Sequence, residues 1–282
     1  MTETVTTPDA TAVADVSGSS VMAETEGGSG RARIVVDALV AAVREVITRE
    51  DVQYSEFHAA VGFLKRVAET GEVPLLLAVF LEATVDEVTH LAHHGSTTTI
   101  EGPFYIAGAP LLEPPYTLPQ RPDEPGERLV VSGTVTGPDG QALAGAELDV
   151  WQATATVPGQ YSNVHPNIPD YNLRGRLRTD ARGMFEVQTV IPAPYEIRKS
   201  GPTGELFGLM GRSAWRPSHV HFKVSRAGYK TLTTQLFFTG GDYLDTDAGN
   251  AVKPDLIIPL TPSPDHNGSH ATYNFVLDTA EL

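Results

Sequence analysis

One stretch of the sequence decides the fold: Trp215-Arg-Pro-Ser-His-Val-His-Phe222, which leads into the β-prone run Val220–Val224. Alternate side chains of a β-strand point to the same face, so His219 and His221 would project together. A sheet presents two imidazoles to one metal ion in this way, and imidazole is a common ligand of several metals. Taken alone, the pair also fits two histidines on an ordinary polar face.

Similar short β-prone runs, separated by turn signals, continue on both sides of this stretch. They are Leu129–Val135, Ala146–Trp151, Arg174–Thr179, Phe185–Val190 and Leu232–Phe238. Short strands at this spacing predict an antiparallel β-sandwich rather than a parallel sheet built from alternating strands and helices. Neither a GxGxxG nor a Walker motif occurs, so nothing in the sequence favours nucleotide chemistry.

The N-terminal third has a different texture. Residues 1–30 are rich in Thr, Ala, Ser and Gly and predict a disordered tail. Apolar residues then recur at three- and four-residue steps, which predicts amphipathic helices over about 34–47, 55–69 and 74–94. Residues 101–126 hold seven prolines and no helical period, so they predict an extended connector.

The predicted fold class is therefore α+β, with an N-terminal helical region followed by an antiparallel β-sandwich that carries the metal site. We expect a disordered tail over residues 1–30 and a helical dimerisation or linker domain over residues 31–100. Residues 101–282 are expected to form the catalytic β-sandwich domain, with the proline-rich connector at its start.

Composition excludes several classes of protein. The 282 residues include no cysteine, which rules out disulfides, thiolate zinc sites, iron–sulfur clusters and cysteine nucleophiles. The formal net charge of -15 argues against nucleic acid or an anionic membrane as a partner. No apolar run approaches the roughly 20 residues that span a bilayer, so we expect no membrane protein. No secretory signal is evident, so a reducing cytoplasm is the expected location.

Two tyrosines extend the histidine pair into a possible ligand set. Tyr161 lies in Gly159-Gln-Tyr-Ser162, and Tyr195 ends the rigid loop Ile191-Pro-Ala-Pro-Tyr195. Each alone fits a core or turn position. Phenolate, however, is a hard anionic donor that prefers a trivalent ion, and a cation lowers its pKa far below the usual value of about 10. Two tyrosinates and two histidines together favour Fe(III) over Fe(II), zinc or copper.

Seven segments, in this order, resemble the intradiol ring-cleavage dioxygenases, and the similarity extends over roughly residues 34–258. They are Glu101-Gly-Pro-Phe-Tyr-Ile-Ala-Gly-Ala-Pro110, Asp149-Val-Trp-Gln-Ala153, Gly159-Gln-Tyr-Ser162, Arg174-Gly-Arg-Leu-Arg-Thr-Asp180, Gly201-Pro-Thr-Gly204, Arg216-Pro-Ser-His-Val-His221 and Tyr243-Leu-Asp-Thr-Asp247. Within the family, the resemblance is greatest to the enzymes that act on catechol itself. Two departures, Ser218 in place of the usual alanine and Glu-Ile-Arg-Lys after Tyr195, remove no ligand.

The resemblance implies an Fe(3+) centre with four protein ligands and a solvent-derived hydroxide. The ligands would be Tyr161, Tyr195, His219 and His221, with Tyr195 and His221 axial. It also implies that Arg216 and Gln235 lie beside the substrate. Tyr195 would leave the metal and accept a substrate proton, and Arg216 would stabilise negative charge that develops on the ring.

The same resemblance implies that O2 and a catechol are converted to a cis,cis-muconate. The expected pocket wall consists of Leu75, Ala78, Ile100, Gly102, Pro103 and Tyr105. The small Ala78 suggests room for substituted catechols, although it fits simple helix packing equally well. A homodimer through the N-terminal helices is expected, and the resemblance also allows a phospholipid bound at that interface.

Three alternatives stay open on the sequence alone. The first is a sister intradiol enzyme that acts on hydroxyquinol or chlorocatechol. The second, from another class, is a β-sandwich binding module without catalysis, because sandwiches host many unrelated functions. The third is a cupin-like Fe(II) extradiol enzyme, which would need a carboxylate ligand and would be colourless as isolated.

Overall fold

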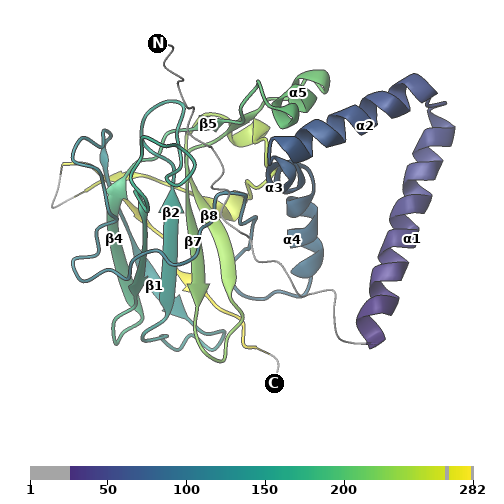
Figure 1. Ribbon diagram of the computed structural model, residues 1–282. Coiled ribbons are helices and arrows are strands. Elements are labelled where there is room, and N and C mark those ends of the chain that lie inside the picture. The colour runs from purple at the N-terminus through teal and green to yellow at the C-terminus, as the bar shows by residue number, and fades with distance from the viewer. Residues whose placement is uncertain (1–25, 264–266, 281–282) are drawn as a thin grey trace, which may run out of the picture. The chain divides into compact units, whose positions relative to one another are not determined.

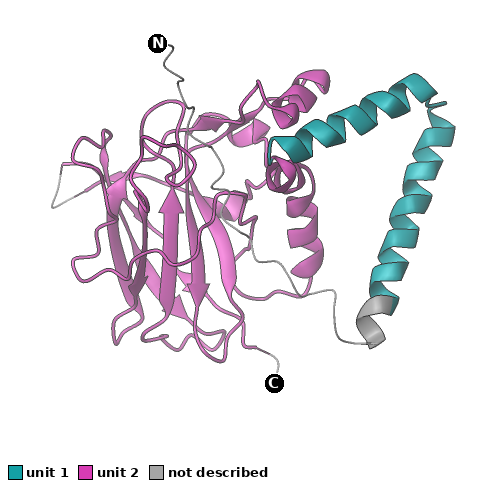
Figure 2. Ribbon diagram, viewed as in Figure 1, with its two compact units in different colours: residues 1–71 teal, residues 72–282 magenta. Residues whose placement is uncertain are grey.

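The structure is a computed structural model that describes residues 26–263 and 267–280. The chain divides into two compact units, residues 1–71 and residues 72–282 (Figure 2). Within the described residues, no helix is long and apolar enough to cross a membrane.

The first unit contains two helices, α1 (Glu26–Arg49) and α2 (Tyr54–Glu69), close to the first two predicted ones. Helix α1 begins inside the stretch that was predicted as a tail, and residues 1–25 lie outside the described residues. The Glu56 carboxylate accepts a hydrogen bond of 2.8 Å from the Gln53 amide, which satisfies one free N–H at the start of α2. Most apolar side chains of both helices are exposed.

The second unit opens with the third predicted helix, which differs from the prediction in two ways. It consists of α3 (Val73–Leu77), the π-helical turn η1 (Ala78–Glu82) and α4 (Ala83–Thr89). Single π turns inside α-helices are rare and frequently occur at functional sites. The helix ends at Thr89, earlier than the predicted end near His94, where His90 leaves the helical conformation and its amide bonds back to Asp86 O.

Two five-stranded sheets and a two-stranded ribbon form the β region (Figure 1). In the first sheet β1 pairs with three other strands, β4, β11 and β12, and β10 pairs with β11. Their bounds are β1 Arg128–Thr136, β4 Met184–Val190, β10 Thr261–Pro262, β11 Ser269–Thr272 and β12 Phe275–Val276. The second sheet has the order β3-β2-β7-β8-β9. Its strands are β2 Glu147–Gln152, β3 Arg174–Arg178, β7 His219–Ser225, β8 Leu232–Phe238 and β9 Ile257–Ile258.

The predicted purely antiparallel sandwich is wrong, because both larger sheets are mixed. Strand β1 pairs in parallel with β11 and β12, and β8 pairs in parallel with β9. Parallel neighbours need a long crossover connection, and residues 239–256 supply one between β8 and β9. That connection contains two short 3-10 turns, η2 (Leu244–Thr246) and η3 (Pro254–Leu256).

Three further elements were absent from the sequence prediction. Strands β5 (Tyr195–Glu196) and β6 (Trp215–Arg216) pair with each other, and helix α5 (Pro202–Leu209) lies between them in the chain. Helix α5 begins at Gly201-Pro202, and the Glu72 carboxylate accepts a hydrogen bond of 2.9 Å from the Thr203 amide in its first turn. The ribbon places Tyr195 opposite Arg216.

The main core lies between the two larger sheets and takes side chains from both. Leu129 and Val131 of β1 and Phe185 of β4 belong to it, together with Phe222 and Val224 of β7. A smaller buried cluster of aromatic side chains forms separately, around Trp151, Tyr161 and Tyr195. Strand β7 therefore serves the core with one face and leaves the other for His219 and His221.

Candidate metal centre

His219 and His221 lie on β7 as the alternation predicts, and each residue is buried, with 2% of its surface exposed. Val220 and Phe222, the residues that alternate with them, pack in the core. Strand β7 is the middle strand of its sheet, paired with β2 on one side and β8 on the other. This double pairing fixes the register, so the two imidazoles cannot slip to the core face.

The hydrogen bonds of His219 determine which of its ring nitrogens is free. Its Nδ1 lies 2.6 Å from the Pro217 carbonyl oxygen, which can only accept, so Nδ1 carries the hydrogen. The lone pair is therefore on Nε2, which lies 3.1 Å from His221 Nε2 and 3.3 Å from the Tyr161 hydroxyl. Burial lowers the pKa of His219 to about 3 and lowers the pKa of His221 as well, so both rings are neutral.

Two tyrosines complete this group of donor atoms. Tyr161 follows β2 and Tyr195 lies on β5, and their rings meet edge to face with centroids 5.4 Å apart. Burial raises the pKa of both phenols, and the positive charge of Arg216 acts against this at each of them. Two phenol oxygens and two neutral imidazoles thus face one another in a buried space.

This donor set fits a bound cation. Among the described residues, His221 Nδ1 is buried without a hydrogen-bond partner, while Nε2 lies against the lone pair of His219. A metal ion would accept the Nε2 lone pairs of both rings, and its charge would favour phenolate over phenol. A hard trivalent ion suits two phenolate oxygens better than a soft one.

Aromatic side chains pack against the rings of the candidate ligands, and sequence reasoning did not single them out. Trp151 stacks on His221, with ring centroids 4.5 Å apart and an angle of 12° between the planes. Phe104 stacks on Tyr161 at 4.7 Å. Arg174 lies 5.6 Å from the centre of the Tyr161 ring and donates to Ser162 Oγ at 2.7 Å. Trp151 and Arg174 belong to segments quoted for the family resemblance, which was the only signal for them.

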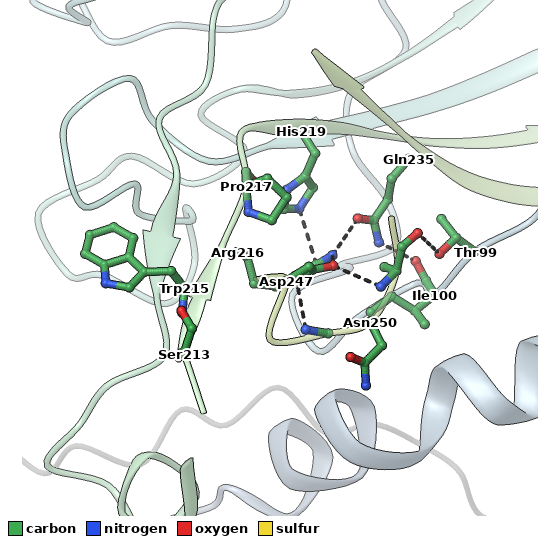
Figure 3. A network of polar contacts seen from close by, with 12 residues as sticks. Thr99, Ile100, Ser213, Trp215, Arg216, Pro217, His219, Gln235, Asp247 and Asn250 are labelled. Atoms are coloured by element: carbon green, nitrogen blue, oxygen red, sulfur yellow. Dashed lines mark hydrogen bonds and ion pairs between the residues drawn. The ribbon is translucent and has the colours of Figure 1, made fainter. Parts of the chain in front are cut away.

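Arg216 is a buried cation beside the two histidines and Tyr195, and several hydrogen bonds fix its guanidinium (Figure 3). Its Nε donates to Asp247 Oδ1 at 2.8 Å and its Nη2 donates to Gln235 Oε1 at 2.8 Å. Nη1 lies 3.4 Å from His219 Nε2. Burial alone would lower the pKa of Arg216, but the Asp247 carboxylate outweighs it and raises the pKa above its ordinary value. Arg216 therefore stays charged although it is buried.

Asp247 was missed by sequence reasoning, although the segment that contains it was quoted. Its carboxylate also accepts backbone hydrogen bonds from Gly249 and Ala251, at 3.1 and 2.9 Å. Gly249 packs against the guanidinium so closely that a Cβ there would lie 2.9 Å from Arg216 Nε. The turn at residues 247–251 is thus shaped around the arginine.

The predicted pocket residues lie in several places. Gly102 has φ +75°, and a Cβ on it would lie 3.8 Å from His221 Cε1, beside the donor group. Tyr105 packs on Trp151, and its hydroxyl donates to Asp149, whose pKa burial raises to about 6. The other four are Leu75, beside Val79 and Phe207; Ala78, buried in η1; Ile100, buried in the main core; and Pro103, half-buried. Their role as a substrate wall stays a prediction.

Comparison with known proteins identifies the family. Residues 30–97 match the profile described as the catechol dioxygenase N terminus, and residues 100–279 match the one described as dioxygenase. The chlorocatechol 1,2-dioxygenase of Pseudomonas putida is 43% identical over 227 residues, which cover 80% of this chain and 86% of that protein. The chain belongs to the intradiol ring-cleavage dioxygenase family. It is therefore an oxidoreductase that opens catechol rings between the hydroxyl-bearing carbons.

Two further members of the intradiol family are similar over most of their length. The catechol 1,2-dioxygenase 2 of Acinetobacter lwoffii is 37% identical over 237 residues, 82% of this chain and 85% of that protein. The crystal structure of 3-chlorocatechol 1,2-dioxygenase from Rhodococcus opacus 1CP superposes with a TM-score of 0.84 at 44% identity. The match covers 89% of this chain and all of that one.

The buried ion pair between Arg216 and Asp247 gives a first prediction. Asp247→Asn leaves the guanidinium without its counter-charge, so we expect the free energy of unfolding to fall by about 3–5 kcal/mol. The neighbouring carboxylate Asp245 is exposed, and Asp245→Asn should change stability by no more than about 0.5 kcal/mol. Urea denaturation of the iron-free proteins measures the free energy of unfolding of wild type and of both variants.

The same experiment has a pH dependence with a definite sign. The guanidinium lowers the pKa of Asp247, so the pair stabilises the folded protein above the ordinary aspartate value of 3.8. As pH falls through the lower, folded-state pKa, this contribution is lost and the stabilities of wild type and Asp247→Asn converge. Equal stabilities at neutral pH would contradict the prediction.

Proposed function

We propose that the protein cleaves a catechol with O2 at a non-haem Fe(III) centre and releases a cis,cis-muconate. The iron ligands would be Tyr161, Tyr195, His219 and His221. The observation that carries the proposal is the convergence of two phenols and two neutral imidazoles around a buried space beside Arg216. Such a donor set suits a trivalent metal, and the four residues come from three separate parts of the chain.

Fe(III) would act as a Lewis acid that binds both catechol oxygens and draws electron density from the ring. The protein's own groups would handle protons and charge. The Tyr195 oxygen is the candidate acceptor for a substrate proton, because burial raises the pKa of its phenol, so its phenolate would be a strong base once released. Arg216, fixed by Asp247 and Gln235, would stabilise negative charge that develops on the substrate. Stacked aromatic rings around His221 and Tyr161 would exclude water.

The test is a visible absorption spectrum of the purified protein, with its iron quantified and catechol added under nitrogen. We expect a tyrosinate-to-iron charge-transfer band that shifts to longer wavelength when catechol binds. Colourless protein that contains iron would contradict the ferric tyrosinate site. Protein that stays colourless and iron-free after reconstitution with ferric iron would favour the non-catalytic binding module.

Tyr195→Phe separates metal binding from proton transfer. The variant should keep iron, but catecholate formation in stopped-flow spectra should slow by about 100-fold, because a positioned base contributes roughly that much. Tyr116→Phe is a suitable control, since Tyr116 donates its hydroxyl to Arg178 O outside the donor group. An unchanged rate in Tyr195→Phe would remove its role as base.

The comparisons favour chlorinated catechols as a second candidate substrate. The two relatives that share 43 and 44% of their residues with this chain are named for chlorocatechols, whereas the catechol 1,2-dioxygenase shares 37%. Ala78, small and buried in η1, supports room for a substituent. We infer that substituted catechols are accepted at least as well as catechol.

This inference predicts the effect of a larger side chain at position 78. Ala78→Val adds two methyl groups and should lower kcat/KM for 4-chlorocatechol relative to catechol by at least about tenfold, since a single methyl-sized change in an apolar pocket is worth about 1–3 kcal/mol. Specificity constants for catechol, 4-chlorocatechol and hydroxyquinol, with the melting temperature as the folding control, measure it. A wild-type preference for catechol or hydroxyquinol of more than about tenfold would reject the chlorocatechol assignment.

We also propose that the chain forms a homodimer through its helices. Leu77, Leu81, Val85 and Val88 recur at four- and three-residue steps and are each about half exposed or more. Helix α1 exposes Ile34, Leu39 and Val43 to a similar extent. Exposed apolar stripes of this kind typically mark interaction surfaces. The acyl chain of a phospholipid could also bind to such an apolar surface. We further propose that the protein is located in the cytoplasm.

Sedimentation velocity tests the dimer. Val85→Lys places a charge in the apolar stripe and should convert the dimer to a monomer at micromolar concentration. Glu87→Lys changes an exposed residue outside the stripe on the same helix and should leave the dimer intact. A wild-type monomer would reject the proposal. Mass spectrometry of an organic extract would detect a bound phospholipid.

A further inference from the structure

Glu82 is a half-buried carboxylate that the proposed chemistry does not use. It ends the π-helical turn η1, and its Oε1 accepts two backbone hydrogen bonds, from Glu101 at 2.7 Å and from Gly102 at 3.2 Å. Within the described residues, no lysine or arginine forms an ion pair with it. Burial raises its pKa, against the effect of the two amides. Burial therefore disfavours the charged form of Glu82, and the groups that bind its carboxylate are two backbone amides.

The peptide group that Glu82 holds is also held from its other side. The Glu101 amide belongs to the same peptide plane as the Ile100 carbonyl, and Gln235 Nε2 donates to that carbonyl at 2.7 Å. The other end of the Gln235 amide accepts from Arg216 (Figure 3). One peptide plane is therefore fixed between the π turn and the arginine network. Its C=O and N–H point in opposite directions, so the two contacts fix both sides of the plane, and loss of one leaves it held on one side alone.

The position of this peptide bears directly on the donor group. The next residue, Gly102, adopts φ +75°, which favours glycine, and lies beside the His221 ring. On the other side, the Ile100 side chain is buried. A rotation of the peptide would move both residues, and they are two of the expected contacts of the catechol ring.

We propose that Glu82 is a positioning residue for substrate binding, which sets the wall formed by Ile100 and Gly102 by holding the peptide between Ile100 and Glu101. This inference rests on the proposed function. This role would explain the π turn. Its extra residue brings the Glu82 carboxylate to the two amides, while Ala78 stays buried one turn earlier. Glu82 thus couples the helix that carries Ala78 to the loop beside His221.

A pair of variants separates the hydrogen bonds from the rest of the side chain. In Glu82→Gln the amide oxygen can still accept from both backbone groups, whereas Glu82→Met has a similar length and no acceptor of comparable strength. Glu87→Ala, at an exposed position of the following helix, is the control.

The first measurement is hydrogen exchange on the iron-free proteins. The amides of Glu101 and Gly102 should exchange at least about tenfold faster in Glu82→Met, because their shared side-chain acceptor is lost. In Glu82→Gln and Glu87→Ala they should stay within about threefold of wild type. Unchanged exchange in Glu82→Met would overturn the proposal without any reference to iron or activity.

The second measurement is anaerobic titration of the iron-loaded proteins with catechol and 4-chlorocatechol. Glu82→Met should raise the dissociation constants about tenfold and change their ratio, while kcat falls less than about threefold and Glu82→Gln restores binding. Faster exchange with unchanged dissociation constants would mean a purely structural contact and would overturn the proposal. So would a Glu82→Gln variant that binds as poorly as Glu82→Met.

Failure of the proposed function would look different. Wild-type protein without the charge-transfer band or without a ring-cleaved product would contradict that function and, with it, the role assigned to Glu82. Wild-type protein with normal colour and turnover, combined with a silent Glu82→Met variant, would overturn only the present inference.

Discussion

The structure depends on the two-faced burial of strand β7. One face must supply apolar side chains to the main core, and the opposite face must supply two imidazoles to a closed space. Pairing with β2 and β8 fixes the register that keeps the two sets apart. A slip by one residue would turn Phe222 toward the donor group and His221 into the core. The fold and the site therefore both depend on the register of β7.

The electrostatics of the site depend on Arg216, whose positive charge is balanced by the Asp247 carboxylate before any ligand binds. Arg216 and Asp247 form a buried ion pair whose carboxylate has two further backbone donors. The four candidate ligands are neutral as they stand, because burial disfavours both phenolate and imidazolium. The four candidate ligands thus carry little charge themselves. A bound cation would lower the pKa of Tyr161 and Tyr195 and so deprotonate them. The pair keeps a fixed positive group beside Tyr195 and His219 at the same time.

Local patterns predicted much of this arrangement. Alternation identified β7 and placed His219 and His221 on one face, and helical periodicity placed α1 and α2. The parallel pairings of β1 and β8 could not be predicted, because they depend on where distant segments return. The donor chemistry of phenolate made Tyr161 and Tyr195 possible ligands, and the family resemblance then implied the full set of four. Asp247, Trp151 and Glu82 act through contacts across the fold, which spacing along the chain does not encode. The π turn is equally invisible, since its apolar period differs little from that of an α-helix.

The pairing of β1 has a consequence for the order in which the protein is made. Leu129 aligns with Ser269 and Val135 with Phe275, so β1 keeps open hydrogen-bonding groups until residues 269–276 have left the ribosome. All four candidate ligands and Asp247 are synthesised before that point. The donor group is therefore complete in sequence while one side of β1 still lacks its partners β11 and β12. Contacts between such distant segments make folding slow, so the proposed iron would enter after translation, when the last strands have paired with β1.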